Sequence, residues 1–231
     1  MYSFSHHRHR SAGEVLDKET KGLIGSGGWR YDLHEWLTDL FLFRGKVREL
    51  RQKTVDLARI QPGETVLDVG CGTGTLVMEV ASRVGRTGRV AGIDPGSQQI
   101  VRARAKAARR NVPIEFQIGV IEQLTFPDQT FDVVFSTLMM HHLPAPLKRQ
   151  GLAEIARVLK PGGRLVIVDF THRSDRQGQS TRFHAGGSRT HDLTDLVSET
   201  SFSQVETEEM RPARFSAFPG AGFVLAHKSS D

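Results

Sequence analysis

The residues best placed to do chemistry form a glycine-rich turn that follows an acid within an apolar run. The acid is Asp68, and the glycines of the turn are Gly70, Gly72 and Gly74. Apolar residues then recur at helical spacing from Thr75, so the order predicts a buried strand, a tight turn and a helix. Alternate glycines let a ligand approach the main chain, and the unpaired N–H groups at the start of a helix attract an anionic group. The segment therefore predicts a binding site for a small cofactor.

The spacing of these glycines distinguishes between cofactors. The dinucleotide pattern G-x-G-x-x-G requires a third glycine where this chain has Thr75. Gly74 gives G-x-G-x-G instead, which argues against an NAD-type oxidoreductase. Asp94 follows a second apolar strand, where a carboxylate can accept hydrogen bonds from the hydroxyls of a ribose. The alternative for Asp94 is a cap on the helix expected to start near Ser97.

Two later segments follow at intervals that match a known family. Residues 119–128 run into a strand-like stretch at 131–134, and residues 157–165 indicate a helix, a Pro-Gly-Gly turn and a strand. With the glycine turn and the acid after the second strand, they resemble the class I S-adenosylmethionine-dependent methyltransferases over about residues 60–170. The N-terminal extension around residues 31–33 looks most like the ubiquinone and menaquinone C-methyltransferase branch, which has a methyltransferase type 11 domain.

The resemblance implies S-adenosyl-L-methionine as the cofactor and S-adenosyl-L-homocysteine as its product. It implies these cofactor-binding residues: Tyr31, Asp68, Gly70, Gly72, Thr73, Gly74, Asp94, Val120, Ile121 and Thr137. Asp68 would face the methionine part, Asp94 the ribose, and the Ile121 N–H a ring nitrogen of the adenine. The family commonly has an acidic or amide residue in place of Val120, so a hydrogen bond worth roughly 0.5–1.5 kcal/mol is lost. Glu122 could replace it, although a solvent-facing or capping position is expected for that side chain.

Histidines follow the predicted fourth and fifth strands, at the edge where an open parallel sheet binds its ligand. His141 and His142 come after the fourth strand, and either could accept a proton from the methyl acceptor as a catalytic base. The alternative is that the pair has no catalytic role, since many relatives carry it whatever their acceptor. His172, His184 and His191 follow the fifth strand and could also reach the crevice. No pair has the spacing of a metal site, so no metal is expected.

Alternating strand-like and helix-like segments must position these residues. Strands are predicted at residues 65–69, 89–93, 114–118, 131–136, 164–169, 204–210 and 222–227. Helices are predicted at residues 45–60, 74–84, 97–109, 146–159 and 192–200. This order, with the resemblance, predicts an α/β, Rossmann-like fold: a seven-stranded, mostly parallel sheet with an antiparallel last strand and helices on both faces. Residues 161–163 are expected to form the turn before the fifth strand.

The chain is expected to form one methyltransferase domain behind a tail. The predicted parts are a flexible N-terminal tail, a helical lid, a cofactor-binding core and a C-terminal substrate-side segment, at residues 1–28, 29–60, 61–170 and 171–231. Apolar residues within 29–43 recur every three or four positions, which indicates an amphipathic helix. We expect this helix to close over the cofactor, with Tyr31 near the methionine end. A permanently docked core helix is the alternative.

Composition restricts the function classes. The 231 residues are 38% hydrophobic and 25% charged, which suits one globular domain. No transmembrane helix is expected, because the sequence has no apolar run of about 18 residues, and one cysteine fits a reducing, cytoplasmic location. The net charge of +5 includes a cluster on one predicted helix, at Arg102, Arg104, Lys106, Arg109 and Arg110. Alanines and not aromatic residues separate these cations, so we expect a solvated helix face and no specific nucleic-acid partner.

These observations predict an enzyme that methylates a small molecule. The signature of nucleic-acid N-methyltransferases, Asn/Asp-Pro-Pro-aromatic, is replaced by Thr-Leu-Met-Met at residues 137–140. The methionine pair and the aromatic helix at 29–43 indicate a small, mostly apolar organic acceptor, and a homodimer is compatible with the chain. The alternative is a non-catalytic, S-adenosylmethionine-binding regulator or scaffold, which the loss of the adenine contact at Val120 would suit.

Overall fold

The computed structural model describes residues 45–171, 190–212, 218 and 220–230. The predicted tail, the helix at 29–43 and Tyr31 lie outside the described residues, as do His172 and His184. His191 belongs to a described helix, but its side chain is not described.

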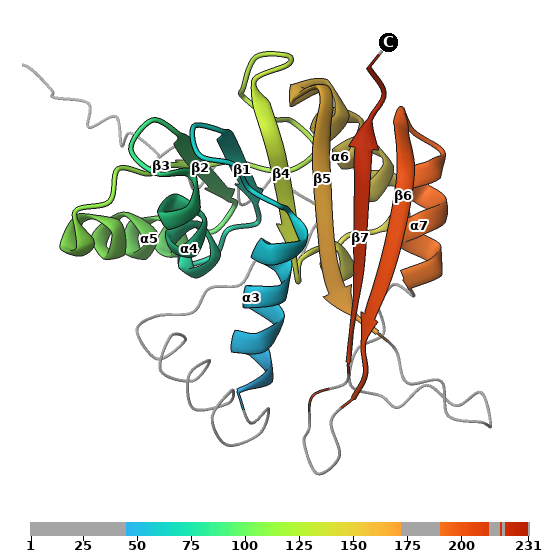
Figure 1. The fold of residues 1–231 in the computed structure, drawn as a ribbon, viewed down its shortest axis with the longest axis horizontal. Helices are drawn as coiled ribbons and strands as arrows, with labels where there is room; N and C mark the ends of the chain where they lie inside the picture. Colours follow the sequence, from blue (N-terminus) through green and yellow to red (C-terminus); the bar gives the residue numbers. More distant parts are fainter. Residues whose placement is uncertain (1–44, 172–189, 213–217, 219, 231) are drawn as a thin grey trace, which may run out of the picture.

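One seven-stranded sheet forms the centre of the fold, with the strand order β3-β2-β1-β4-β5-β7-β6 (Figure 1). The strands are β1 (Thr65–Val69), β2 (Arg89–Asp94), β3 (Glu115–Ile118), β4 (Phe131–Thr137), β5 (Leu159–Phe170), β6 (Phe202–Met210) and β7 (Ala221–Lys228). Strands β1 to β5 pair in parallel, whereas β7 lies antiparallel between β5 and β6. The predicted fold class is confirmed, including the reversal of the last strand.

Helices cover both faces of this sheet (Figure 1). They are α3 (Lys46–Leu57), α4 (Thr75–Val84), α5 (Ser97–Arg110), α6 (Ala145–Val158) and α7 (Thr190–Ser198). Alternate side chains of β4 point to opposite faces: Val133 and Phe135 pack with α3, α4 and α5, and Val134 packs with α6 and α7. The apolar alternation thus creates two cores, one on each face of the sheet.

The fifth strand differs from its prediction. It begins at Leu159 and includes the Pro-Gly-Gly segment that was expected to be a separate turn. The pairing of β4 with β5 shifts register here, from Phe131↔Leu159 to Val133↔Arg164. Gly163 allows this excursion, because a Cβ there would lie 3.1 Å from the carbonyl oxygen of Asp132. The expected turn is therefore an irregularity in the pairing of a continuous strand.

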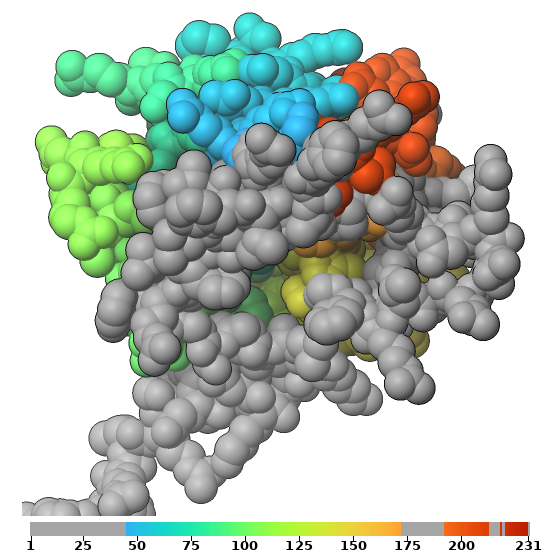
Figure 2. Space-filling view, turned by 90° about the horizontal axis from the view of Figure 1, so that it is seen from below, coloured from blue at the N-terminus to red at the C-terminus, as the bar shows by residue number. Residues whose placement is uncertain are grey.

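Helix α3 lies beside strands that come at the far end of the chain, as Figure 2 shows for one face of the molecule. Its Lys53 ammonium lies 2.8 Å from the Glu208 carboxylate of β6 and 4.8 Å from the ring centroid of Phe223 in β7. Leu50 and Val55 are fully buried on its inner side. The part of the predicted lid segment that is described is thus docked into the core.

The sheet order places the ligand crevice. Strand order reverses between β1 and β4, whose following segments leave in opposite directions along the sheet. In open parallel sheets the crevice lies at the carboxyl ends of the strands at such a switch point. The glycine turn follows β1 at this edge, and η2 (Met140–His142) follows β4.

Candidate functional site

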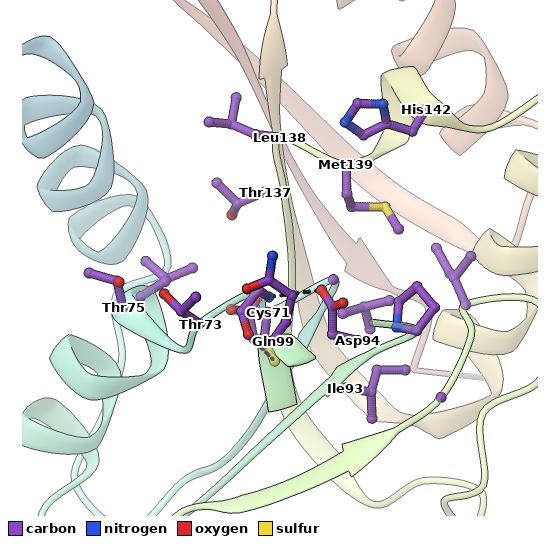
Figure 3. Close-up of a pocket in the computed structure, with 18 of the residues that line it drawn as sticks. Cys71, Thr73, Thr75, Ile93, Asp94, Gln99, Thr137, Leu138, Met139 and His142 are labelled. Carbon is purple, nitrogen blue, oxygen red and sulfur yellow. Dashed lines mark hydrogen bonds between the residues drawn. The ribbon is translucent and has the colours of Figure 1, made fainter. Parts of the chain in front are cut away.

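A cavity of about 460 Å³ lies at this edge (Figure 3). Small-molecule sites typically enclose roughly 300–1,000 Å³, so the size suits a cofactor and part of an acceptor. Most of the predicted cofactor residues line it: Asp68, Gly70, Gly72, Thr73, Asp94, Val120, Ile121 and Thr137. Of the two others, Gly74 lies just behind the wall and Tyr31 lies outside the described residues.

The glycine turn is fixed to the neighbouring strand by its backbone. The N–H groups of Gly70 and Cys71 both donate to the carbonyl oxygen of Ile93, each at 2.9 Å. Gly72 has a φ of +54°, and a Cβ added there would have no heavy atom within 4 Å among the described residues. Its backbone therefore faces open space, as a turn that receives a ligand requires.

Gly74 and Gly70 are glycines for reasons of packing as well. A Cβ on Gly74 would lie 2.9 Å from Cζ of Phe116, so this glycine lets α4 approach β3 and α5 closely. A Cβ on Gly70 would lie 2.9 Å from Cγ of Met139. Met139 also lines the cavity, which makes the segment after β4 a direct neighbour of the turn.

Both carboxyl oxygens of Asp94 accept backbone hydrogen bonds, one of them from the glycine turn. Oδ2 accepts a hydrogen bond from the Gly72 N–H at 2.9 Å, and Oδ1 accepts one from the Gly96 N–H at 2.8 Å. Gly96 is the residue before α5, so Asp94 fixes the backbone that leads into the helix, and no side-chain cap on α5 is seen among the described residues. Burial raises the pKa of Asp94, and these two backbone hydrogen bonds oppose the rise. Each oxygen keeps a second lone pair, and the side chain lines the cavity, so Asp94 can also accept from a ribose.

Asp68 is a buried acid with an unsatisfied oxygen. Its Oδ1 has no hydrogen-bond partner among the described residues, and neither has Oγ1 of Thr137 beside the same cavity. Burial, and secondarily the negative charge of Asp94, raises the pKa of Asp68 to about 7. Such atoms are costly in a folded protein unless a ligand satisfies them. S-adenosylmethionine fits this set, because it carries an ammonium and a sulfonium for the acid.

The loop after β3, which is predicted to hold the adenine, lines the cavity. Val120 and Ile121 line the cavity, and Ile121 packs so closely on α6 that a Cβ on Gly151 would lie 2.6 Å from its Cγ1. Glu122 is half-buried and lines the cavity as well. A carboxylate is therefore present next to Val120, where the family residue is missing.

The two histidines have different surroundings. His142 lines the cavity, whereas His141 does not and points to Asp169 at the end of β5 (Figure 3 shows His142). Asp169 is 2% exposed; its Oδ1 lies 2.6 Å from Nδ1 of His141, and its Oδ2 accepts the His141 backbone N–H at 2.8 Å. The two imidazole centroids are 3.9 Å apart. Asp169 was missed in the sequence, although an acid at the end of a long apolar strand is a usable signal.

Two cations near the cavity were also missed. Arg51 of α3 is the only lysine or arginine among the described lining residues, and its Nη1 lies 3.6 Å from Oε1 of Glu79. Lys106 belongs to the basic cluster that was expected to be solvated, yet it bonds to the glycine-turn region, and Arg104 donates to the Phe116 carbonyl. The solvated-face prediction is thus wrong for Lys106, which is half-buried, whereas Arg104 is exposed as expected although it makes this hydrogen bond.

The described part of the chain shows neither a metal site nor a membrane-spanning helix. No group of three or more histidine, cysteine or acidic side chains there could hold a metal ion. None of the described helices is long and apolar enough to cross a membrane.

Comparison with known proteins points to one family. Residues 66–163 match the family described as "Methyltransferase domain". The chain is 35% identical over 156 residues to the ubiquinone/menaquinone biosynthesis C-methyltransferase UbiE of Hydrogenovibrio crunogenus, covering 67% of this chain and 59% of the relative. It is 35% identical over 157 residues to an arsenite methyltransferase of Halobacterium salinarum, covering 64% of this chain and 40% of the relative.

Solved structures share the fold. A SAM-dependent methyltransferase from Aquifex aeolicus superimposes with a TM-score of 0.64 at 22% identity, covering 77% of this chain and 89% of that chain. The [4+2]-cyclase SpnF gives a TM-score of 0.69 at 20% identity, covering 79% and 81%. Because a cyclase has the same fold, the fold alone does not fix the reaction. The curated relatives named above are also longer proteins, of which the chain spans about half.

Proposed function

Because this chain belongs to the class I S-adenosylmethionine-dependent methyltransferases, we propose that it transfers a methyl group from S-adenosylmethionine to a small, mostly apolar organic acceptor. The observation that carries the proposal is the unsatisfied Asp68 oxygen in a cavity framed by the glycine turn. A buried carboxylate oxygen without a partner is stabilised by a hydrogen-bond donor or a cation. A nucleoside that carries an amino acid supplies such a group. The bound cofactor would contribute an electrophilic methyl carbon on sulfur, and the chain's own residues would hold and orient the two reactants.

The holding residues divide by chemistry. Asp68 would pair with positive charge on the cofactor, and Asp94 would accept from the ribose while it keeps the Gly72 N–H in place. Glu122 would accept from the adenine amino group in place of the family residue at Val120. Holding two reactants in a reactive geometry can supply several kcal/mol of a barrier, so positioning is the main catalytic contribution we propose.

The acceptor side of the cavity is apolar. Leu138, Met139 and Leu143, which we call the acceptor wall, line the cavity around η2 together with His142. Apolar side chains exclude water from the reacting atoms and favour an apolar acceptor body. This wall supports the proposed substrate class, and His142 adds one polar group to it.

His142 is the group that we propose accepts a proton from the acceptor. Its ring lines the cavity, so a ring nitrogen can take the proton that an acceptor hydroxyl or acidic carbon loses on methylation. His141 does not line the cavity, and we propose a positioning role for it. Asp169 holds Nδ1 of His141 in one orientation, and the His141 ring packs on His142.

The competing function is a non-catalytic cofactor-binding regulator. Valine at position 120, where the family commonly has an acidic or amide residue, favours this function. Glu122 weakens the argument, because it brings a carboxylate to the same part of the cavity. The two functions separate in one experiment, in which the protein is incubated with S-adenosylmethionine carrying a labelled methyl group and a fractionated metabolite extract. Mass spectrometry should find a labelled product one methylene heavier than its precursor. Cofactor binding without any labelled product in any fraction would favour the regulator.

Calorimetry tests the cofactor by itself. We expect S-adenosylhomocysteine to bind and NAD to bind weakly or not at all, because Thr75 replaces the third glycine of a dinucleotide site. Tighter binding of NAD than of S-adenosylhomocysteine would contradict the proposed function.

A further inference from the structure

A lysine on α5 reaches the rim of the cofactor cavity. The ammonium of Lys106 donates hydrogen bonds to Oγ1 of Thr73 and to Oγ1 of Thr75, both at 3.0 Å. Thr73 follows Gly72 in the glycine turn and is 4% exposed, and Thr75 is the first residue of α4. Both threonines line the cavity (Figure 3), whereas Lys106 does not.

These hydrogen bonds fix the direction of the two hydroxyl groups. An ammonium can only donate, so each threonine oxygen must accept from Lys106 and turn its own hydrogen elsewhere. Among the described residues, neither hydroxyl donates a hydrogen bond. Lys106 therefore presets Thr73 and Thr75 as two hydrogen-bond donors at the cavity wall.

The same wall carries further positive potential. Helix α4 begins at Thr75, and within the described chain its first turn has neither an acidic residue nor a side-chain cap, so its N–H groups can face a ligand. The guanidinium of Arg51 lies near Glu79, one helical turn after Thr75, and also lines the cavity. Two preset donors, a helix start and a cation form a receptor for an anion.

Another part of the cavity wall carries acidic side chains, whose charge is opposite to that of the wall formed by Thr73, Thr75 and Arg51. Asp68 and Asp94 line it, and Oδ1 of Asp68 lacks a partner among the described residues. One cavity thus offers donors to an anion and an acceptor to a cation, as a zwitterionic amino-acid group requires. We infer that Lys106, through Thr73 and Thr75, positions the α-carboxylate of the cofactor's amino-acid part and makes the site selective for nucleosides that carry it. This inference rests on the proposed cofactor.

The test compares two ligands that differ only in the amino-acid part. S-adenosylhomocysteine has the carboxylate, and 5′-methylthioadenosine has the same adenosine and thioether without it. In Lys106→Met the two threonine hydroxyls lose the ammonium that directs their hydrogens toward the cavity, so we expect the Kd for S-adenosylhomocysteine to rise by about tenfold. The Kd for methylthioadenosine should stay within about twofold. The matched control is Arg109→Met, which removes the same charge from an exposed position of α5 and should change neither Kd.

Threonine variants provide an independent arm. Thr75→Val keeps the shape of the side chain and removes its hydroxyl. It should therefore also weaken the binding of S-adenosylhomocysteine and leave the binding of methylthioadenosine unchanged. In a Thr73→Val/Thr75→Val background, Lys106→Met should add little, because its effect passes through these hydroxyls. If Lys106→Met does not fold, Thr75→Val still reads out the same selectivity.

The outcomes separate the inference from the proposed function. Equal weakening of both ligands in Lys106→Met, or no weakening of either, overturns the inference and leaves the cofactor assignment in place. Wild-type protein that binds neither S-adenosylhomocysteine nor S-adenosylmethionine overturns the proposed function. A selective loss confined to the carboxylate-bearing ligand supports both.

Discussion

The buried acid Asp68 makes the stability of the fold depend on pH. Its pKa is raised from 3.8 to about 7, first by burial and then by the charge of Asp94. The folded state therefore holds the Asp68 proton more tightly than the unfolded chain does. The contribution of this group to stability is present below about pH 4 and is lost as the pH rises through about 7.

We predict that the unfolding free energy falls across this window, by up to about 1.4 kcal/mol per pH unit from this group. Asp68→Asn removes the ionisation and should flatten that part of the profile. Urea denaturation of both proteins at pH 5 and at pH 7.5 measures the difference. Because the cofactor brings positive charge to the ionised acid, saturating S-adenosylmethionine should restore more stability to the wild type at pH 7.5 than at pH 5. Parallel pH profiles for wild type and variant would contradict the assignment.

Asp94 makes two structural hydrogen bonds, and we expect its side chain to bind the cofactor as well. We predict that Asp94→Ala weakens the binding of S-adenosylhomocysteine by roughly 2–3 kcal/mol, because the ribose hydroxyls lose a charged acceptor. It should also lower the Tm, since the Gly72 and Gly96 N–H groups lose their partner. Calorimetry and thermal melting measure the two effects, with Asp128→Ala, at an exposed acid, as the control. A lower Tm with unchanged affinity would assign Asp94 to holding the Gly72 and Gly96 backbone alone.

Elements position the reactive residues through backbone geometry. Strands β4 and β5 run in parallel and end at the same edge, so Asp169 at the end of β5 meets η2, which follows β4. Neither the histidine pair nor the acid is informative alone, because 28 residues separate Asp169 from His141. Their relation depends on strand pairing.

We predict that Asp169→Asn lowers kcat by about 10²-fold once an acceptor is known, because His141 loses the carboxylate that orients it. His142→Ala should lower kcat at least as much, since it removes the proposed proton acceptor itself. Affinity for S-adenosylhomocysteine should stay near the wild-type value in both, which calorimetry checks. Full activity of His142→Ala at all pH values would show that His142 is not the group that accepts the proton.

The glycine turn offers a second prediction at the scale of elements. Gly74→Ala should destabilise the fold by roughly 2–4 kcal/mol, because its φ of +76° is strained for alanine and the Cβ would meet Phe116 at 2.9 Å. Gly72→Ala has the same type of φ but no close neighbour among the described residues, so roughly 1–2 kcal/mol is expected. Chemical denaturation measures both variants. Similar losses in the two would show that φ alone, and not the approach of α4 to β3, explains Gly74.

At the scale of the whole molecule, the sequence predicted elements better than contacts. Strand and helix positions follow from local periodicity and from glycine and proline, and β1 was placed without error. The irregularity in β5 was missed because it depends on pairing with β4. The roles of Asp169 and Lys106 were missed for the same reason, since each contact joins residues far apart in the chain.

The predicted lid at residues 29–43 belongs to this scale as well, because it concerns how the N-terminal segment meets the domain. It lies outside the described residues and stays a prediction. Helix α3, which follows it, is docked through Leu50 and Val55. We expect hydrogen exchange of residues 29–43 to slow when S-adenosylhomocysteine binds, while exchange in α3 is slow in both states. Equal, strong protection of 29–43 with and without the ligand would favour a permanently docked helix.

The contact between Met139 and Gly70 limits how this protein could acquire a new substrate. Met139 belongs to the proposed acceptor wall, yet its side chain also covers the first glycine of the turn. A larger residue at position 139 would press on that turn, and a smaller one would leave a void beside it. We therefore expect one substitution at Met139 to change both the range of acceptors and the affinity for the cofactor. An evolutionary or laboratory path to another acceptor that passes through Met139 needs a compensating change near Gly70.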